Sequence, residues 1–360
     1  MYCPPQIFFV GGHFKIINLN NRTLTSMKKF LLVLALLAIV CPYNSSVNAQ
    51  TVDVPGVIFE TDMGNDIDDA LALDLLHKAV DDGQIKLLAV SCHKESPTAC
   101  KYVSVMNKWY GHPEVVVARA PHCKINNKYF DYTSVVESAP KSLTRDIPAP
   151  EDAVKMYRRV LASQPDKSVI IISVGFSTVL AELLDSTADE YSPLNGCELV
   201  AAKVKLTSIM AGGFRPRKAA EFNILNDITA ARKVFDKWPA PIALSPSELG
   251  NMVKYPGTSI ANDFTWAKWH PMVEAYRAWK EMPYNRSMWD PTSVLYALQP
   301  TSDMFTRTEE GRVVVDERGM TSFTPQAGGR DRILSVDPKQ AARMKAYFVQ
   351  VITRKPSNHK

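Results

Sequence analysis

The fold of this chain is decided by the stretch Val57-Ile58-Phe59-Glu60-Thr61-Asp62-Met63-Gly64-Asn65-Asp66-Ile67-Asp68-Asp69-Ala70-Leu71-Ala72-Leu73. Three apolar residues lead into an acid, a turn with glycine follows, and a helical pattern then opens on further acids. Left unpaired, such clustered acids repel one another and raise each other's pKa values, and a hard cation with several oxygen ligands removes that repulsion. The ends of strands in open α/β sheets line the ligand crevice. The stretch therefore predicts a functional site after the first strand.

Helix capping is the competing interpretation of these acids. Aspartate is favoured at the N-cap and in the first helical turn, where it compensates the free N–H groups and the helix dipole. A cap needs one acid, however, and four aspartates lie between positions 62 and 69. We therefore expect some of them to serve chemistry.

Apolar, β-branched runs alternate with helical patterns along the chain. Alternation of this kind predicts an α/β fold with a Rossmann-like, mostly parallel central sheet flanked by helices. The expected strands are Val57–Phe59, Leu87–Ser91, Val115–Ala118, Val169–Ser173, Val204–Met210 and Ile242–Leu244. The expected helices span residues 68–79, 97–110, 151–162, 177–185 and 228–236.

Two further segments stand apart from this alternation. Residues 119–149 form a long stretch with little periodicity, and loops of this length are often functional. The C-terminal part predicts a small extension: a hairpin around Val313–Val315 and Ser322–Thr324, a strand near Ile333–Val336, and a closing helix from Pro338.

The first 49 residues have the pattern of a leader. Met27-Lys28-Lys29 begins a signal-peptide pattern, an apolar run follows from Phe30 to Val40, and Val47-Asn48-Ala49 supplies small residues before the cut. The run is too short for a stable membrane anchor. We expect export through Met27–Ala49 to the periplasm or the medium, residues 1–26 to be a gene-model extension, and residues 50–360 to form a single domain.

The charge of the chain is mostly that of the leader. The 42 basic residues exceed the 37 acidic ones, but residues 1–49 contain four of the basic residues and no acid. The remainder gives no reason to expect nucleic-acid or anionic-membrane binding. Cys92, Cys100, Cys123 and Cys197 follow the leader without zinc spacing, and their pairing stays open, as does homo-oligomer formation.

The opening stretch resembles the signature of the inosine-uridine-preferring nucleoside hydrolase family, Asp-x-Asp-Pro-Gly-x-Asp-Asp-Ala. Glu60-Thr61-Asp62 stands where Asp-x-Asp would be, Gly64 is kept, and Asp68-Asp69-Ala70 closes the motif after two extra residues. Either Asp66 or Asp68 can fill the role of the first closing aspartate. The resemblance implies a nucleoside hydrolase-like fold, with Asp62 and Asp69 as metal ligands.

Three later segments resemble the same family in the same order. Met210 with Gly212-Gly213, followed by Glu221-Phe222-Asn223, resembles the segment whose Glu and Asn hold the ribose hydroxyls. Ser173–Leu180 resembles a strand end whose backbone carbonyl, here that of Val174, binds the metal. Trp289-Asp290-Pro291 resembles a His-Asp-Pro segment; Asp290 would be a metal ligand, and Trp289 replaces the histidine near the leaving base.

The resemblance implies calcium-dependent hydrolysis of the N-glycosidic bond of a ribonucleoside or related riboside. Asp62 is the expected base, Ca²⁺ the expected cofactor, and a small nucleoside or riboside the expected partner. Expected ligands of the metal or substrate are Asp62, Asp66, Asp68, Asp69, Val174, Met210, Glu221, Asn223, Trp289 and Asp290. Only oxygen ligands are offered to the metal, which favours a hard cation.

Three alternatives remain at this stage. An exported Ca²⁺-dependent sugar- or nucleoside-binding protein without catalysis fits the altered leaving-group side. A hydrolase of a different glycoside fits the same machinery. A phosphatase that uses Asp-x-Asp at a strand end is disfavoured, because Glu60 stands where its nucleophilic aspartate would be. The acid that protonates the leaving base is open, with Tyr284, His93 and solvent as candidates.

Overall fold

The computed structural model describes residues 54–122 and 131–359 of the chain. The predicted leader, residues 1–49, lies outside the described residues, as do Cys123 and the stretch 124–130 of the long segment. Among the described residues, Cys92, Cys100 and Cys197 are free thiols. No helix in these ranges combines the length and apolar composition needed to cross a bilayer.

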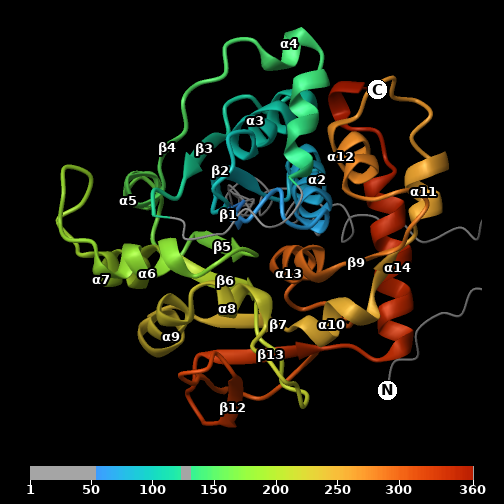
Figure 1. The fold of residues 1–360 in the computed structure, drawn as a ribbon. Coiled ribbons are helices and arrows are strands. Elements are labelled where there is room, and N and C mark those ends of the chain that lie inside the picture. The colour runs from blue at the N-terminus through green and yellow to red at the C-terminus, as the bar shows by residue number, and fades with distance from the viewer. Residues whose placement is uncertain (1–53, 123–130, 360) are drawn as a thin grey trace, which may run out of the picture. The chain divides into compact units, whose positions relative to one another are not determined.

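A mostly parallel sheet organises the fold (Figure 1). From one edge, parallel neighbours follow in the order β4, β3, β2, β1, β5, β6, β7 and β13, and the antiparallel hairpin of β11 and β12 completes the other edge. These strands span β1 Gly56–Thr61, β2 Lys86–Cys92, β3 Val116–Arg119, β4 Glu151–Asp152, β5 Val169–Ser173, β6 Val204–Met210, β7 Ile242–Ser245, β11 Gly311–Val315, β12 Thr321–Pro325 and β13 Asp331–Ser335. The short β10 (Thr306–Arg307) also pairs with β13.

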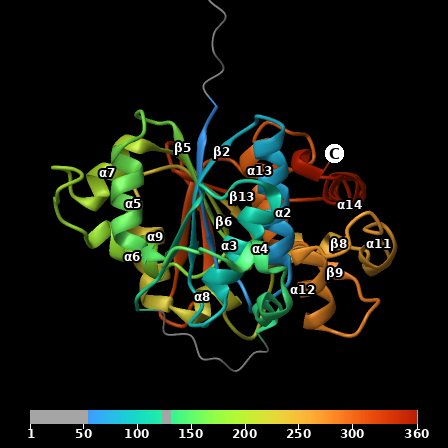
Figure 2. The same cartoon turned by 90° about the horizontal axis from the view of Figure 1, so that it is seen from above.

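Helices cover both faces of the sheet (Figure 2). One face carries α2 Asp68–Asp81, α3 Ala99–Tyr110, α12 Pro271–Trp279, α13 Trp289–Leu298 and α14 Pro338–Ile352. The other face carries α5 Ala153–Ala162, α6 Thr178–Asp185, α7 Gly196–Lys203 and α9 Ile228–Lys237. Strand β1 is buried on both sides, because Val57 and Phe59 enter the first core and Ile58 enters the second.

The order in which successive strands join the sheet reverses at β1. The chain proceeds outward from β1 through β2 to β4, returns to place β5 against the other side of β1, and then continues outward again to β13. Such a switch point opens a crevice at the carboxyl ends of the two strands. Asp62 follows β1 there and Val174 follows β5.

Most elements predicted from the sequence are confirmed. All six strands, the hairpin and the closing helix are present, with shifts of a few residues. The helix predicted from residue 151 begins at Ala153, because Glu151–Asp152 pairs with β3 and the Asp152 side chain caps the helix through Lys155 N at 3.0 Å. The long segment is not without structure, since it contains η1 (Tyr132–Ser138) and α4 (Lys141–Thr144).

Several short elements were not predicted. Besides η1, α4, α7, α12, α13, β4 and β10, they are α8 Phe222–Asn226, α10 Ser247–Met252, α11 Gly257–Asn262, η2 Ser357–His359, and the small antiparallel sheet of β8 Lys254–Tyr255 and β9 Arg286–Ser287.

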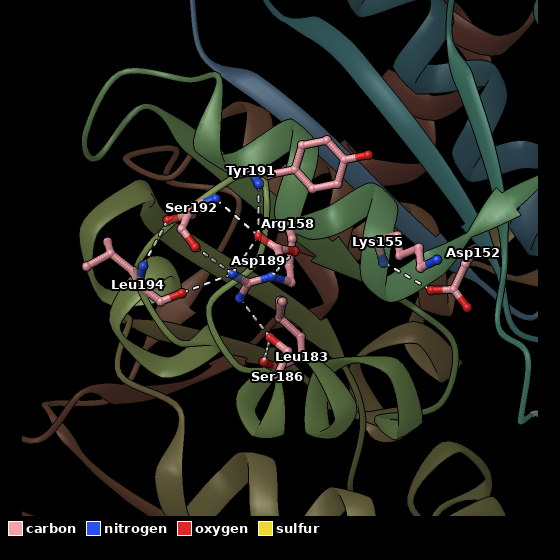
Figure 3. Close-up of polar contacts among 9 residues, drawn as sticks. All are labelled: Asp152, Lys155, Arg158, Leu183, Ser186, Asp189, Tyr191, Ser192 and Leu194. Atoms are coloured by element: carbon pink, nitrogen blue, oxygen red, sulfur yellow. Dashed lines mark hydrogen bonds and ion pairs between the residues drawn. The ribbon is translucent and has the colours of Figure 1, made fainter.

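Arg158 of α5 fixes the connection between α6 and α7 (Figure 3). Its guanidinium is buried, pairs with Asp189 (Nη2–Oδ1 2.9 Å), and donates to Ser186 Oγ and to the carbonyl of Leu194, both at 3.0 Å. Buried charges are tolerated when they are paired and fully hydrogen-bonded. The Arg158 side chain therefore holds the connection between α6 and α7 against α5.

Candidate active site

A cavity of about 500 Å³ lies at the carboxyl ends of β1, β5 and β6. Every site residue predicted from the sequence lines it, namely Asp62, Asp66, Asp68, Asp69, Val174, Met210, Glu221, Asn223, Trp289 and Asp290. Residues from five separate segments thus meet at the switch point of the sheet.

Three of the aspartates form one compact cluster. Asp68 and Asp69 begin α2, Asp290 lies in the first turn of α13, and one carboxylate oxygen of each lies within 4.8 Å of the others. All three side chains are buried. The backbone N–H of Asp290 donates to Asp68 Oδ2 at 3.0 Å, so the two helix N-termini face the same acids.

Burial shifts the proton affinity of this cluster. Desolvation, supported by the neighbouring Asp62, raises the pKa of Asp68 to about 7 even though backbone N–H groups oppose the shift. Burial, together with repulsion from the neighbouring aspartates, also raises the pKa values of Asp69 and Asp290 well above the ordinary range. A cation would remove both causes, because it replaces the lost water and cancels the repulsion.

The donor set fits a hard divalent cation. Thr61 donates its hydroxyl to Asp69 Oδ1, and this contact leaves Asp69 Oδ2 buried without a hydrogen-bond partner. A buried, unpartnered carboxylate oxygen is costly unless it binds a charge. Val174 also lines the cavity, and its carbonyl accepts a hydrogen bond from Asn223 Nδ2, which leaves a second lone pair on that oxygen.

Asp62 occupies the end of β1 beside this cluster. It is 5% exposed, and Asn65 Nδ2 donates to its Oδ2 at 2.7 Å. Burial raises the pKa of Asp62, and the hydrogen bond from Asn65 opposes that rise. A carboxylate whose pKa lies above its usual range is a better acceptor of a proton from water than an ordinary aspartate.

Glu221 and Asn223 line the cavity from the start of α8. Glu221 is also the N-cap of that helix, since its carboxylate accepts from the backbone N–H groups of Asn223 and Ile224. The Asn223 amide donates to the carbonyls of Val174 at 2.8 Å and Met210 at 3.0 Å. These carbonyls fix its orientation, so Oδ1 remains to accept a hydrogen bond from a ligand.

The two candidates for the first closing aspartate lie in different surroundings. Asp68 lies in the buried cluster, whereas Asp66 lies at the rim, where it forms an ion pair with Arg286. The two residues inserted relative to the family motif therefore leave Asp68-Asp69 together at the start of α2.

Neither side chain proposed as the leaving-group acid lines the cavity. His93 is fully buried; its Nε2 lies 3.2 Å from Glu60 Oε1, and its Nδ1 lies 2.9 Å from the Phe176 carbonyl. The Tyr284 hydroxyl donates to the Tyr276 carbonyl at 2.6 Å. The indole N–H of Trp289 is also engaged, by the Ser247 carbonyl at 3.0 Å.

Sequence reasoning missed several cavity residues, namely Asn65, Arg217, Phe222, Ser247, Asn251, Trp279 and Arg286. Asn65 and Phe222 lie inside motifs that were recognised. Trp279 and Arg286 lie at the end of α12 and in β9, and nothing in the local pattern marks them. The one available signal was the nearness of Arg286 to Trp289 and Asp290 in the sequence.

The cavity thus combines three buried aspartates with a carboxylate and an amide at the switch point of a mostly parallel α/β sheet. The model of the family described as inosine-uridine preferring nucleoside hydrolase matches residues 57–352, and the chain belongs to this family. No curated protein matches the chain in sequence.

Solved structures show the same fold at low identity. A plant nucleoside hydrolase superposes with a TM-score of 0.65 at 19% identity, with 84% of this chain and 100% of that chain covered. The inosine-uridine preferring nucleoside hydrolase from Bacillus anthracis gives 0.64 at 18%, covering 83% and 99%. The purine-preferring ribonucleoside hydrolase from Gardnerella vaginalis gives 0.61 at 17%, covering 83% and 98%. The fold is therefore that of a nucleoside hydrolase over the 83–84% of the chain that these superpositions cover.

Proposed function

We propose that this N-glycosyl hydrolase cleaves ribonucleosides, or closely related N-ribosides, in a calcium-dependent reaction. The main observation in support is that Asp69 Oδ2 has no hydrogen-bond partner inside the buried cluster that Asp69 forms with Asp68 and Asp290. Asp62, Asp69, Asp290 and the Val174 carbonyl are the proposed metal ligands. Ca²⁺ is the proposed ion because all four donors are oxygens and no histidine or thiolate lines the described part of the cavity.

The chain's own groups supply the remaining chemistry. A cation held by these ligands would lower the pKa of a water molecule and orient it. Asp62 accepts a proton from the attacking water molecule, while the oxygen of that water forms a bond to the anomeric carbon. The C–N bond breaks, and its electron pair leaves with the base. Nearby carboxylates stabilise the positive charge that develops on the sugar ring.

Glu221 and Asn223 are the proposed ligands of the ribose hydroxyls. A carboxylate oxygen accepts hydrogen bonds from hydroxyl groups, and Asn223 Oδ1 is an acceptor whose direction is already fixed. Met210 lines the cavity beside them, and its sulfur lies 3.3 Å from Asn223 Nδ2. Asp68, which lies in the same cluster, is proposed to bind either a hydroxyl or the ion.

A reducing-sugar assay tests the proposal directly. The purified protein is incubated with a panel of ribonucleosides, with calcium or with excess chelator. We expect release of ribose that disappears with chelator and returns with calcium. Asp290→Asn should remove the activity, whereas Asp303→Asn, an exposed aspartate on the surface, should not. Release that is indifferent to chelator would overturn the calcium dependence.

Two alternatives are separated by the same assay. Nucleoside binding without any release of ribose would indicate a binding protein that has lost catalysis. Cleavage confined to other glycosides would indicate a hydrolase that uses the same site residues on a different class of substrate. Export through Met27–Ala49 is a further proposal, and N-terminal sequencing of the protein secreted by its host would test it by locating the cut after Ala49.

A further inference from the structure

Arg286 lines the cavity beside Trp289, the residue that replaces the histidine of the family motif. It belongs to β9, four residues before Asp290, and lines the same cavity as the acidic cluster. Its guanidinium carbon lies 4.5 Å from the ring centroid of Trp279 and 4.7 Å from that of Trp289. Two indole rings and the short sheet of β8 and β9 therefore position one cation in the active site.

The charge of Arg286 is only partly satisfied. Its Nη2 forms an ion pair with Asp66 at the rim, while its Nε is buried and has no hydrogen-bond partner. Burial lowers the pKa of Arg286 to about 10, and the group remains a cation near neutral pH. Buried donors without a partner are rare in native structures, and a catalytic role is one recognised explanation for them.

The two tryptophans that flank Arg286 are themselves held in place by hydrogen bonds and packing. Trp279 donates its indole N–H to the Asn65 carbonyl, and Trp289 donates to the Ser247 carbonyl, each at 3.0 Å. Gly250 packs directly against the Trp289 ring, and a Cβ built on Gly250 would lie 2.3 Å from Trp289 Cδ1. Both rings are thus fixed by backbone contacts, and no proton donor remains on Trp289 for the leaving group.

We propose that Arg286 stabilises the negative charge that develops on the departing base, in place of an acid that protonates it. This inference rests on the proposed function. As the C–N bond breaks, its electron pair moves onto the leaving nitrogen and into the ring, and a hydrogen bond from Arg286 to a ring acceptor stabilises that charge. The base departs as an anion and takes its proton from solvent. Substrates whose bases carry an oxygen or nitrogen acceptor beside the glycosidic bond fit this site.

Leaving groups of graded basicity test the assignment. The rate kcat/KM is measured for p-nitrophenyl riboside, phenyl riboside and uridine, with wild-type protein, Arg286→Met and Arg286→Lys. For the poorer leaving groups, phenyl riboside and uridine, we expect Arg286→Met to lose about 10²-fold, the typical effect of removing one charge-stabilising donor, and for p-nitrophenyl riboside less than about 10-fold. Arg286→Lys keeps the charge, so its rates should lie between those of the wild type and those of Arg286→Met.

A matched substitution controls for effects of charge on the surface. Arg277→Met alters an exposed arginine of α12 that pairs with Glu274, and it should leave all three rates unchanged. Product inhibition gives a readout other than turnover: p-nitrophenolate should inhibit the wild type more strongly than Arg286→Met. Thermal unfolding verifies that each variant is folded.

The outcomes separate this inference from the proposed function. If the wild type cleaves no riboside, the proposed function fails and Arg286 has no leaving group to stabilise. If the wild type cleaves all three substrates and Arg286→Met loses the same factor on each, the function stands and the leaving-group role is overturned. A loss that grows with the basicity of the leaving group supports it.

Discussion

The backbone N–H of Asp290 donates to Asp68 Oδ2 at 3.0 Å, across 222 positions of sequence. This contact joins the N-terminus of α13 to that of α2. It places the partial positive charges of two helix ends beside three buried acids, an arrangement that favours their ionised forms. Burial nevertheless raises the pKa values of all three acids, so helix dipoles alone do not stabilise the cluster.

Removal of one ligand should abolish tight calcium binding. Asp290→Asn preserves the size of the side chain but removes one charge from a cluster whose members lie within 4.8 Å. We expect isothermal titration calorimetry to show strong binding in the wild type and none in the variant. Asp303→Asn should bind as the wild type does, and equal affinity in Asp290→Asn would show that Asp290 is not a ligand.

The stability of the metal-free protein should fall as the pH rises. An unfolded aspartate ionises near pH 4, whereas burial raises the pKa of folded Asp68 to about 7. Between these values the folded state binds a proton that the unfolded state lacks, so the free energy of unfolding decreases with pH, on the order of 4 kcal/mol for this one group. Thermal unfolding in chelator should give a higher Tm near pH 5 than near pH 8.

Calcium should reverse that trend. The ion binds the ionised carboxylates and competes with protons, so its stabilising effect should be largest near pH 8 and small near pH 5. If the Tm with chelator does not change over this range, the acids do not carry the raised pKa values attributed to them.

The strand ends were predictable because one local pattern specifies both the fold and the site. Val57–Phe59 reads as a strand buried on both faces, and the acids after Thr61 must then lie at its carboxyl end. Val174 and Met210 were assigned by their resemblance to family segments, and they likewise follow or end β5 and β6. In each case a few adjacent residues determine where the side chain lies.

Arg286 and Trp279 were not predictable for the opposite reason. Their positions depend on contacts with distant residues, namely Asp66 for the arginine and the Asn65 carbonyl for the tryptophan. The burial of His93 against Glu60 likewise follows from the pairing of β1 with β2, so its removal from the candidate acids required the three-dimensional fold. The sequence alone could not separate Asp66 from Asp68, because only the packing of α13 against α2 distinguishes them.

Asp62→Asn should lower turnover far more than substrate affinity. The amide keeps an oxygen for the metal but cannot accept the proton of the attacking water, so kcat should fall about 10²–10⁴-fold. Steady-state kinetics combined with the measured affinity for ribose separate the two effects. Calcium titration of the same variant confirms that the ion still binds, and near-normal kcat with bound calcium would remove Asp62 from the role of base.

Asp189 should contribute stability that is lost in acid. Hydrogen bonds from Arg158 lower the pKa of Asp189 to about 2, below its usual value near 4. A depressed pKa stabilises the fold above the unfolded value and loses that contribution as the pH falls toward 2, at roughly 1–2 kcal/mol after screening by solvent. Asp189→Asn should therefore be less stable than the wild type near pH 7, with the difference shrinking below pH 4.

A surface ion pair provides the comparison for this effect. Asp166 pairs with Lys203 but is 74% exposed, so Asp166→Asn should change the free energy of unfolding by less than about 1 kcal/mol at any pH. Urea unfolding at several pH values measures both variants. A constant difference between Asp189→Asn and the wild type from pH 7 to pH 3 would contradict the assigned shift.

Asn223→Ala should weaken recognition of the ribose more than that of the base. The amide Nδ2 is held by the carbonyls of Val174 and Met210, so only Oδ1 is free to accept from a sugar hydroxyl. Loss of that acceptor should cost about 1–3 kcal/mol of binding when the hydroxyl is buried without a partner.

A 2′-deoxynucleoside already lacks one hydroxyl, so its KM should respond less if Asn223 contacts the 2′-hydroxyl. Asn226→Ala, on the same helix but outside the cavity, controls for α8 itself. An equal loss of affinity for ribo- and 2′-deoxyribo-substrates would show that Asn223 holds the Val174 carbonyl in place and does not bind the 2′-hydroxyl.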